Sequence, residues 1–297
     1  MSPVLAIFVA LGSLTLAFLG VLASALRRTR LAGEPLPIPS VFQVALGFVT
    51  NFFDTLGIGS FATTTAVFKF KKMLPDQLFP GTLNVGHALG AIFQSFIFIS
   101  VIEVDPMTLI LLIGSAVVGA WFGAGFVSGL SRRTVQLGMG VALLVAASAM
   151  FMSQLKLFPV GGTAIGLEGW KLGLGIFGNF VLGAMMTLGI GLYAPCMTLI
   201  SLLGMNPAAA FPIMMGSCAF LMPVASMRFI KNGAYAPKVA LGLAIGALLG
   251  VPLAAFVVKS LPLTVLRWVV IVVVVYAAVL MLRSAAQESE AQAAVPA

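Results

Sequence analysis

The chain has 297 residues, of which 61% are hydrophobic and only 8% are charged, and its net charge is +8. A soluble domain carries about 25% charged residues, so this composition excludes a soluble globular protein. Lys and Arg lie mainly at the ends of apolar segments, where they report membrane topology rather than a nucleic-acid partner. We therefore expect an all-α polytopic membrane protein in contact with membrane lipid.

The first apolar segment covers residues 3–26, and Arg27, Arg28 and Arg30 follow it directly. A signal peptide has its positive charge before the apolar stretch, and no basic residue precedes this one. The segment is therefore predicted to be a retained transmembrane helix with its N-terminus outside.

Eight further apolar segments follow, at roughly 41–68, 78–102, 107–130, 134–154, 172–203, 208–230, 238–258 and 263–282. Their near-continuous aliphatic runs favour α-helices over the short alternating strands of a barrel. Glycines interrupt the segments 41–68 and 172–203. Residues 284–297 are small and polar, and we expect them to form a disordered cytoplasmic tail.

The two interrupted segments contain the same pentapeptide. Thr-Leu-Gly-Ile-Gly occurs at 55–59 and again at 187–191, an offset of 132 positions, and Phe79-Pro80 falls on Phe211-Pro212 in the same register. Broken apolar segments at matching positions of two halves are typical of the binding site of a secondary transporter.

The distribution of basic residues indicates how these two segments enter the membrane. If both return to their starting side, twelve of the 16 Lys and Arg residues are cytoplasmic; if both cross, only nine are. The Lys/Arg bias of cytoplasmic loops favours the first arrangement. It predicts about seven transmembrane helices plus two re-entrant hairpins, arranged as two inverted repeats with the C-terminus in the cytoplasm. The predicted parts are a helix and linker at 1–36, repeats at 37–155 and 156–283, and the tail at 284–297.

The hairpin tips are predicted to form an anion site near the midplane. Non-helical backbone at membrane depth must line a cavity or be buried in protein, and a helix restarting after a break directs unpaired N–H groups at that cavity. The alternative is that the glycines only let helices pack closely. The candidate substrate-binding residues are Gly57, Ile58, Gly59, Ser60, Phe61, Thr63, Asn84, Gln94, Gly189, Gly191, Leu192, Tyr193 and Ser217.

Two ionisable residues inside apolar segments are candidates for proton coupling. Asp54 precedes the first tip, and an intramembrane charge is a functional candidate by default, although an acid there can also cap helix N–H groups. His87 shares one face of the segment 78–102 with Asn84 and Gln94, a stripe that either faces a cavity or hydrogen-bonds other helices.

The sequences GFVTNFFDTLGIGSFATTTAVFKF at 47–70 and LGIGLYAPCMTLISLLGMNPAAAFPIMMGS at 188–217 resemble the TauE/SafE (sulfite exporter) family of bacterial membrane proteins. The resemblance covers residues 40–283. It implies transport of small sulfur-containing anions such as sulfite, sulfoacetate or other sulfonates across the cytoplasmic (inner) membrane, often outward. The second half departs from a strict copy, because Met186 replaces the acid and Tyr193-Ala194-Pro195 replaces Phe61-Ala62-Thr63.

These observations predict a transporter rather than an enzyme, with no cofactor and no metal, working by alternating access around the tips. No GxxxxGK[ST] pattern for direct ATP drive is present in the sequence. Two alternatives stay open: an anion channel of the same fold, and a thiol or sulfur relay that uses Cys196 and Cys218. A homodimer is also left open.

Overall fold

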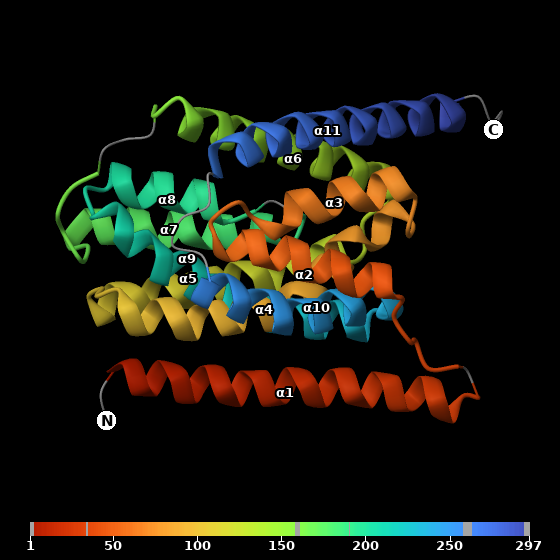
Figure 1. Ribbon diagram of the computed structural model, residues 1–297, viewed down its shortest axis with the longest axis horizontal. Helices are drawn as coiled ribbons and strands as arrows, with labels where there is room; N and C mark the ends of the chain where they lie inside the picture. Colours follow the sequence, from red (N-terminus) through yellow and green to blue (C-terminus); the bar gives the residue numbers. More distant parts are fainter. Residues whose placement is uncertain (1–2, 34, 158–160, 190, 258–262, 294–297) are drawn as a thin grey trace.

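Helices form every regular element of the described residues, which are 3–33, 35–157, 161–189, 191–257 and 263–293 of a computed structural model (Figure 1). The α-helices are α1 (Pro3–Leu31), α2 (Val41–Thr55), α3 (Ser60–Lys71), α4 (Phe79–Val101), α5 (Pro106–Val127), α6 (Arg132–Gln154), α7 (Gly169–Met186), α8 (Tyr193–Leu202), α9 (Ala210–Lys231), α10 (Pro237–Val257) and α11 (Leu263–Ala293). Short 3-10 helices, η1 (Asp76–Leu78) and η2 (Pro207–Ala209), precede α4 and α9. The prediction of an all-helical membrane protein is therefore confirmed.

Within the described residues, 6 helical stretches are long and apolar enough to cross a membrane: 3–31, 76–101, 106–127, 132–154, 207–231 and 237–256. The seventh predicted span forms α11, of which the described part contributes only a shorter apolar stretch, Val274–Gln287. Helix α11 continues to Ala293, so residues 284–293 are helical where the sequence led us to expect disorder. Residues 294–297 lie outside the described residues.

Each Gly-interrupted segment folds as two helices joined by a break. Helices α2 and α3 have their outer ends on the right-hand side of Figure 1, and α7 and α8 have theirs on the left-hand side. The two breaks therefore both lie inside the bundle but are reached from opposite ends of the molecule. The start of α1 and the end of α11 also lie at opposite ends (Figure 1).

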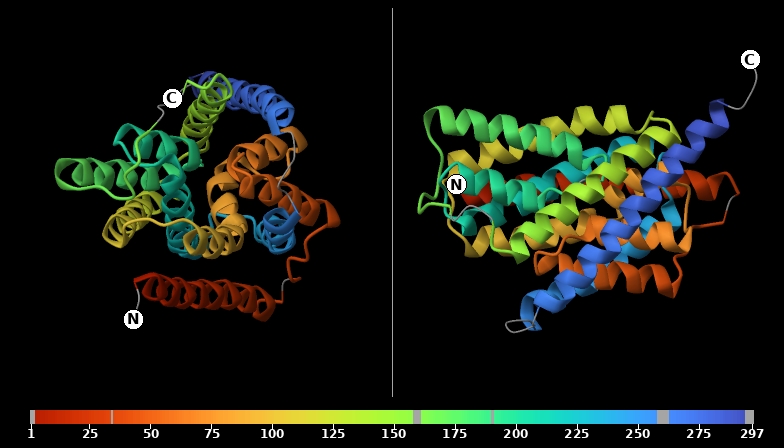
Figure 2. Two further views of the ribbon diagram at one scale, coloured as in Figure 1. Left: turned by 60° about the vertical axis from the view of Figure 1, so that its left-hand side comes forward. Right: turned by 90° about the horizontal axis from the view of Figure 1, so that it is seen from above.

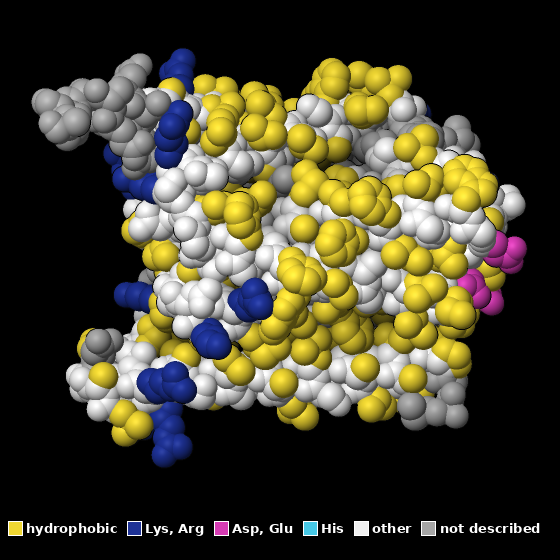
Figure 3. Space-filling view, turned by 180° about the vertical axis from the view of Figure 1, so that it is seen from behind, with side chains coloured by type: hydrophobic (Ala, Val, Ile, Leu, Met, Phe, Trp, Pro, Cys, Tyr) yellow, Lys and Arg dark blue, Asp and Glu magenta, His cyan; other side chains and the backbone are white. Residues whose placement is uncertain are grey.

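The charged side chains separate along the same direction. On the face seen in Figure 3, Lys and Arg gather at one end and Asp and Glu at the other. The end where α1, α3, α5 and α9 finish carries Arg28, Lys71 and Lys231, and we call it the basic end. The opposite end carries Glu103, Asp105 and Glu168, and we call it the acidic end.

The two halves pack against each other through close helix contacts at equivalent positions. Helix α2 packs on α10, and α7 packs on α5. A β-carbon added to Gly250 would collide with the carbonyl of Phe48, and one added to Gly119 would collide with the carbonyl of Phe180. Phe48 and Phe180 are 132 positions apart, which is the offset of the repeated pentapeptide. Small residues let membrane helices approach this closely.

Helix α1 lies at the edge of the bundle (Figures 1 and 2) and contacts mainly α9. In the most apolar 18 residues of α1, only 17% are buried, against 61% in the stretch that contains α4 and 78% in the stretch that contains α9. Helices α4 and α9 are therefore the centre of the bundle, and α1 is a peripheral helix.

Candidate functional site

Glycines create the two breaks in the membrane helices. Gly57, Gly59 and Gly189 have φ angles of 83°, 86° and 94°. Residues with a β-carbon rarely adopt this region, whereas glycine does so without a steric penalty. The duplicated glycines therefore end α2 and α7 inside the bundle, where α3 and α8 begin again a few residues later.

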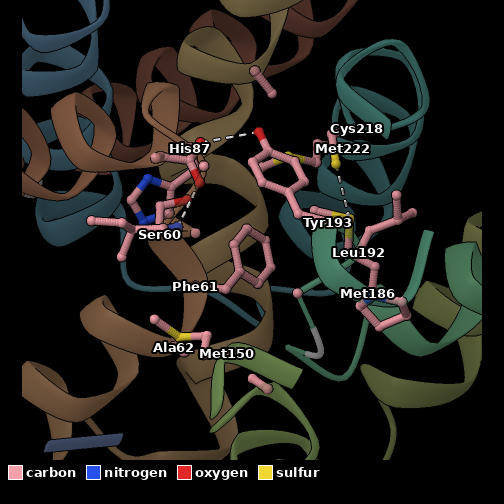
Figure 4. Close-up of a pocket in the computed structure, with 18 residues that line it drawn as sticks. Ser60, Phe61, Ala62, His87, Met150, Met186, Leu192, Tyr193, Cys218 and Met222 are labelled. Atoms are coloured by element: carbon pink, nitrogen blue, oxygen red, sulfur yellow. Dashed lines mark hydrogen bonds between the residues drawn. The ribbon is translucent and has the colours of Figure 1, made fainter. Parts of the chain in front are cut away.

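A cavity of about 70 Å³ lies between the two breaks. Since a water molecule occupies about 30 Å³ of liquid, this space holds a few waters or a compact ion. It is lined by Asp54, Gly57, Ile58, Gly59, Ser60, Phe61, Ala62, His87, Ala91, Ala146, Met150, Met186, Gly191, Leu192, Tyr193, Pro195, Cys218 and Met222. Figure 4 shows Ser60, Phe61 and His87 on one side and Leu192, Tyr193 and Cys218 on the other.

The carboxylate of Asp54 accepts three hydrogen bonds at this cavity. The backbone N–H of Ser60 donates to Oδ1 at 2.6 Å, Nε2 of Gln94 donates to Oδ2 at 2.8 Å, and the hydroxyl of Tyr193 donates to Oδ2 at 3.1 Å. The Tyr193 hydroxyl also lies 2.7 Å from Oε1 of Gln94. A buried carboxylate needs such donors to replace its hydration. Asp54 thus caps α3, as the sequence left open, and also connects the first break to the second.

His87 is held by polar groups of the first half. Its Nδ1 lies 2.9 Å from Nδ2 of Asn51, and its Nε2 lies 3.0 Å from the hydroxyl of Thr64. Nδ2 of Asn51 also donates to the carbonyl of Gly47 at 2.7 Å, which fixes this atom as the amide nitrogen. Nδ1 must therefore accept, and the ring is the neutral tautomer that carries its proton on Nε2.

The second half contributes sulfur atoms to the cavity wall. Cys218 donates to Sδ of Met186 at 3.6 Å, and Met222 lies beside Cys218 (Figure 4). A further methionine, Met150 of α6, lies next to Ala62 on the first half's side of the cavity. Cys196 and Cys218 are both buried free thiols. No group of three His, Cys, Asp or Glu that could hold a metal ion occurs among the described residues.

The structure brings most of the predicted site residues to this cavity. Gly57, Ile58, Gly59, Ser60, Phe61, Gly191, Leu192, Tyr193, Asp54 and His87 line it, and Gln94 reaches it through Asp54.

Besides Gln94, four predicted residues do not line the cavity. The hydroxyl of Thr63 bonds back to the carbonyls of Gly59 and Ser60, and Nδ2 of Asn84 bonds to the carbonyl of Pro80. Ser217 accepts from Nδ2 of Asn179 at 2.9 Å. Gly189 lies against Met139 instead. Thr63 and Asn84 thus bond to carbonyls one turn earlier in the chain, and only Ser217 makes a contact between two helices.

The sequence did not identify the apolar part of the wall. Met150 and Ala146 belong to a helix that carries no motif, and Met222 lies on α9 beyond its motif. Methionines in a membrane protein are expected to be packing residues. The helical periodicity of the segment 78–102 places Ala91 on the same face as His87, so the sequence did indicate that Ala91 lies near the site.

The fold and the cavity define a multi-pass helical membrane protein with a polar site between two broken helices. From α7 to its end, the chain matches a family model: residues 171–297 match the family described as Sulfite exporter TauE/SafE. The resemblance seen in the sequence is thereby confirmed over this second half of the chain, and the family is one of exporter-type membrane transporters. No curated protein and no solved structure matches the chain.

Proposed function

We propose that this protein is a secondary transporter that exports small sulfur-containing anions, such as sulfite, sulfoacetate or other sulfonates, across the cytoplasmic membrane. The observation that carries the proposal is the set of donors around Asp54. A backbone N–H, an amide N–H and a phenol O–H converge on one carboxylate between the two helix breaks. The same three donors suit the oxygens of a sulfite or a sulfonate.

In this proposal the carboxylate of Asp54 occupies the substrate position in the structure described. The distances from its oxygens to the donors, 2.6 to 3.1 Å, are those of a bound oxyanion. Two anions in one desolvated site repel strongly. A substrate anion therefore binds when Asp54 is protonated and turns away, which leaves the N–H of Ser60 and the hydroxyl of Tyr193 for the substrate.

Protonation of Asp54 couples transport to a proton. A sulfite dianion that travels with one proton keeps a net negative charge, and the inside-negative potential drives that charge outward. His87 does not suit this role, because the N–H of Asn51 points at its Nδ1 and leaves no room for a second proton. We therefore assign the coupling role to Asp54 and a positioning role to His87.

We infer an inverted-repeat arrangement with the basic end in the cytoplasm, in agreement with the Lys/Arg rule. The matched contacts of α2 with α10 and of α5 with α7 support it. A second matched pair is the contact of Gly47 with the backbone of Leu243 and the 2.7 Å bond from Asn179 to the carbonyl of Leu112. Labelling of single cysteines placed at Lys71 and Gly204 tests the arrangement: the proposal requires opposite sides of the membrane, and finding both on one side excludes it.

Ligand-induced thermal stabilisation of the purified protein tests the substrate class. Sulfite and sulfoacetate are expected to raise the unfolding temperature more than acetate does. Tyr193→Phe, which lacks one donor, should show a smaller shift, whereas Tyr276→Phe on the exposed side of α11 should keep the full shift. Equal shifts for acetate and the sulfur anions, or an undiminished shift in Tyr193→Phe, would contradict the proposal.

A further inference from the structure

A groove runs beside α1, which packs against the main bundle mainly through α9. Toward the acidic end it contains an apolar cavity of about 400 Å³, lined by residues of α1, α5 and α9 that include Ile7, Ile113, Gly114 and Phe220. Toward the basic end, a second cavity of about 820 Å³ lies between the same three helices. One groove thus has an apolar part and, further along α1, a polar part.

Three basic side chains line the polar part of the groove: Arg28 of α1, and Arg228 and Lys231 of α9. The guanidinium of Arg228 lies 4.0 Å from the centre of the Trp121 ring. It also fills the space beside Gly125, where any β-carbon would collide with it. Among the residues that the structure describes, no carboxylate lies within 4.0 Å of these three cations. Their charge is therefore left without an acidic partner in the described part of the chain.

The ends of the helices account for only part of this feature. Helices α1, α5 and α9 all finish at the basic end, and cations near a helix C-terminus are favourable. That interaction explains why basic residues occur at these helix ends. A side chain that points to the outer surface of the protein would interact with its helix end equally well. The interaction with helix ends does not explain why basic residues of two helices, α1 and α9, line the same cavity of about 820 Å³.

The spacing of the two cavities matches one lipid chain. Ala10 of the apolar cavity and Val21 of the basic cavity are both on α1, and the rise of an α-helix places them roughly 17 Å apart. One leaflet contributes about 15 Å to the hydrocarbon core of a bilayer. A lipid with its headgroup at the basic end therefore has an acyl chain long enough to reach the apolar cavity.

We propose that an anionic phospholipid of the surrounding leaflet occupies this groove. Its phosphate is bound by Arg28, Arg228 and Lys231, and one acyl chain fills the space beside Gly114, Ile113 and Phe220. The lipid supplies contacts between α1 and the bundle that the chain itself does not make, since only 17% of the most apolar 18 residues of α1 are buried. Basic pockets between membrane helices at the cytoplasmic side are suited to anionic headgroups.

Lipid binding to the detergent-purified protein, followed by native mass spectrometry, tests this site without any transport substrate. Phosphatidylglycerol is compared with phosphatidylcholine of the same acyl chains, and with glycerol phosphate to separate a lipid from a free phosphate ester. We expect retained phosphatidylglycerol and little retention of the other two. Arg28→Gln and Lys231→Gln should each weaken binding about fivefold, whereas Arg133→Gln, an exposed cation outside the groove, should not.

A second variant tests the apolar part of the groove. No atom lies within 4 Å of a β-carbon built on Gly114, so Gly114→Leu can place its side chain in the apolar cavity that Gly114 lines. It should reduce phosphatidylglycerol retention while the protein stays folded. Equal retention of both lipids, or retention unchanged in Lys231→Gln and in Gly114→Leu, would overturn the proposal and would leave the transport site unaffected.

Discussion

The hydroxyl of Tyr193 lies 3.1 Å from Oδ2 of Asp54, although the two residues are 139 positions apart in the chain. The same hydroxyl lies 2.7 Å from Oε1 of Gln94, and a phenol has only one proton to donate. In the absence of substrate, a protonated Asp54 can donate to the tyrosine oxygen while Tyr193 donates to Gln94. The contact between the two halves thus accommodates both protonation states of Asp54.

Asp54→Asn should remove the dependence of anion binding on pH. Binding of sulfoacetate, whose charge changes little near neutral pH, is expected to weaken as pH rises in the wild type, because Asp54 must lose its charge before the anion enters. The neutral amide should keep the affinity high throughout. At the alkaline end of the range the variant should bind at least about tenfold more tightly than the wild type, since two anions in one buried site repel each other. Calorimetric titration at several pH values measures this, and parallel pH profiles for both proteins would disprove the role of Asp54.

Tyr193→Phe should lower stability by about 1.5–3 kcal/mol, because it removes a hydrogen bond to a buried charged group. Tyr276→Phe is the matched control, since Tyr276 is 54% exposed on α11 and stacks on Phe70 through its ring. Thermal unfolding of the two variants in the same detergent compares their losses of stability. A loss of equal size in both would show that the contact with Asp54 contributes nothing specific.

Gly57→Ala should destabilise the first break by about 1–2 kcal/mol through backbone strain alone. The φ angle of Gly57 is 83°, yet no atom lies within 4 Å of a β-carbon built there, so steric collision plays no part. Gly173→Ala provides the comparison, because Gly173 lies within α7 with the same open surroundings and without a positive φ angle. We expect a lower unfolding temperature for Gly57→Ala only, and the reverse order would refute the assigned backbone role.

His87→Ala should reduce stability but leave the pH dependence of transport in place. The substitution removes the partner of the Thr64 hydroxyl in a buried setting, which typically costs about 1–3 kcal/mol. Flux into proteoliposomes at several pH values gives the second readout. A pH dependence that disappears in His87→Ala and persists in Asp54→Asn would reverse the roles assigned to these two residues.

The positions of the two helix breaks were predictable from the duplicated glycines, because glycine is the residue that readily adopts the positive φ angles of such a break. The prediction for Gly57 and Gly59 rested on conformation, and both adopt positive φ angles. The roles of Asn84 and Ser217 were not predictable in this way. Helical periodicity shows which residues share one side of a helix, but it does not show what packs against that side. Helix α4 is buried on nearly all sides, so a polar residue on it can meet a backbone carbonyl as readily as a cavity.

The hydrogen bond between Tyr193 and Asp54 also could not be predicted from the sequence. The acid and the tyrosine occupy different positions in their repeats, and nothing in the local pattern connects residues so distant along the chain. The helix at 284–293 was missed for a related reason. Its composition is polar, and α11 extends from an apolar stretch that packs on α6, which composition alone does not reveal.

In the proposed mechanism, the N–H groups and hydroxyls at the two breaks bind a transported sulfur anion. Ser60 is the first residue of α3, where proline is tolerated, so Ser60→Pro removes the donor N–H while the helix remains. Ser60→Ala keeps that N–H and serves as its control. The measurement is counterflow of labelled sulfite into proteoliposomes loaded with unlabelled sulfite. We expect transient accumulation for the wild type and Ser60→Ala, and none for Ser60→Pro. No accumulation by the wild type, or undiminished accumulation by Ser60→Pro, would exclude this binding site.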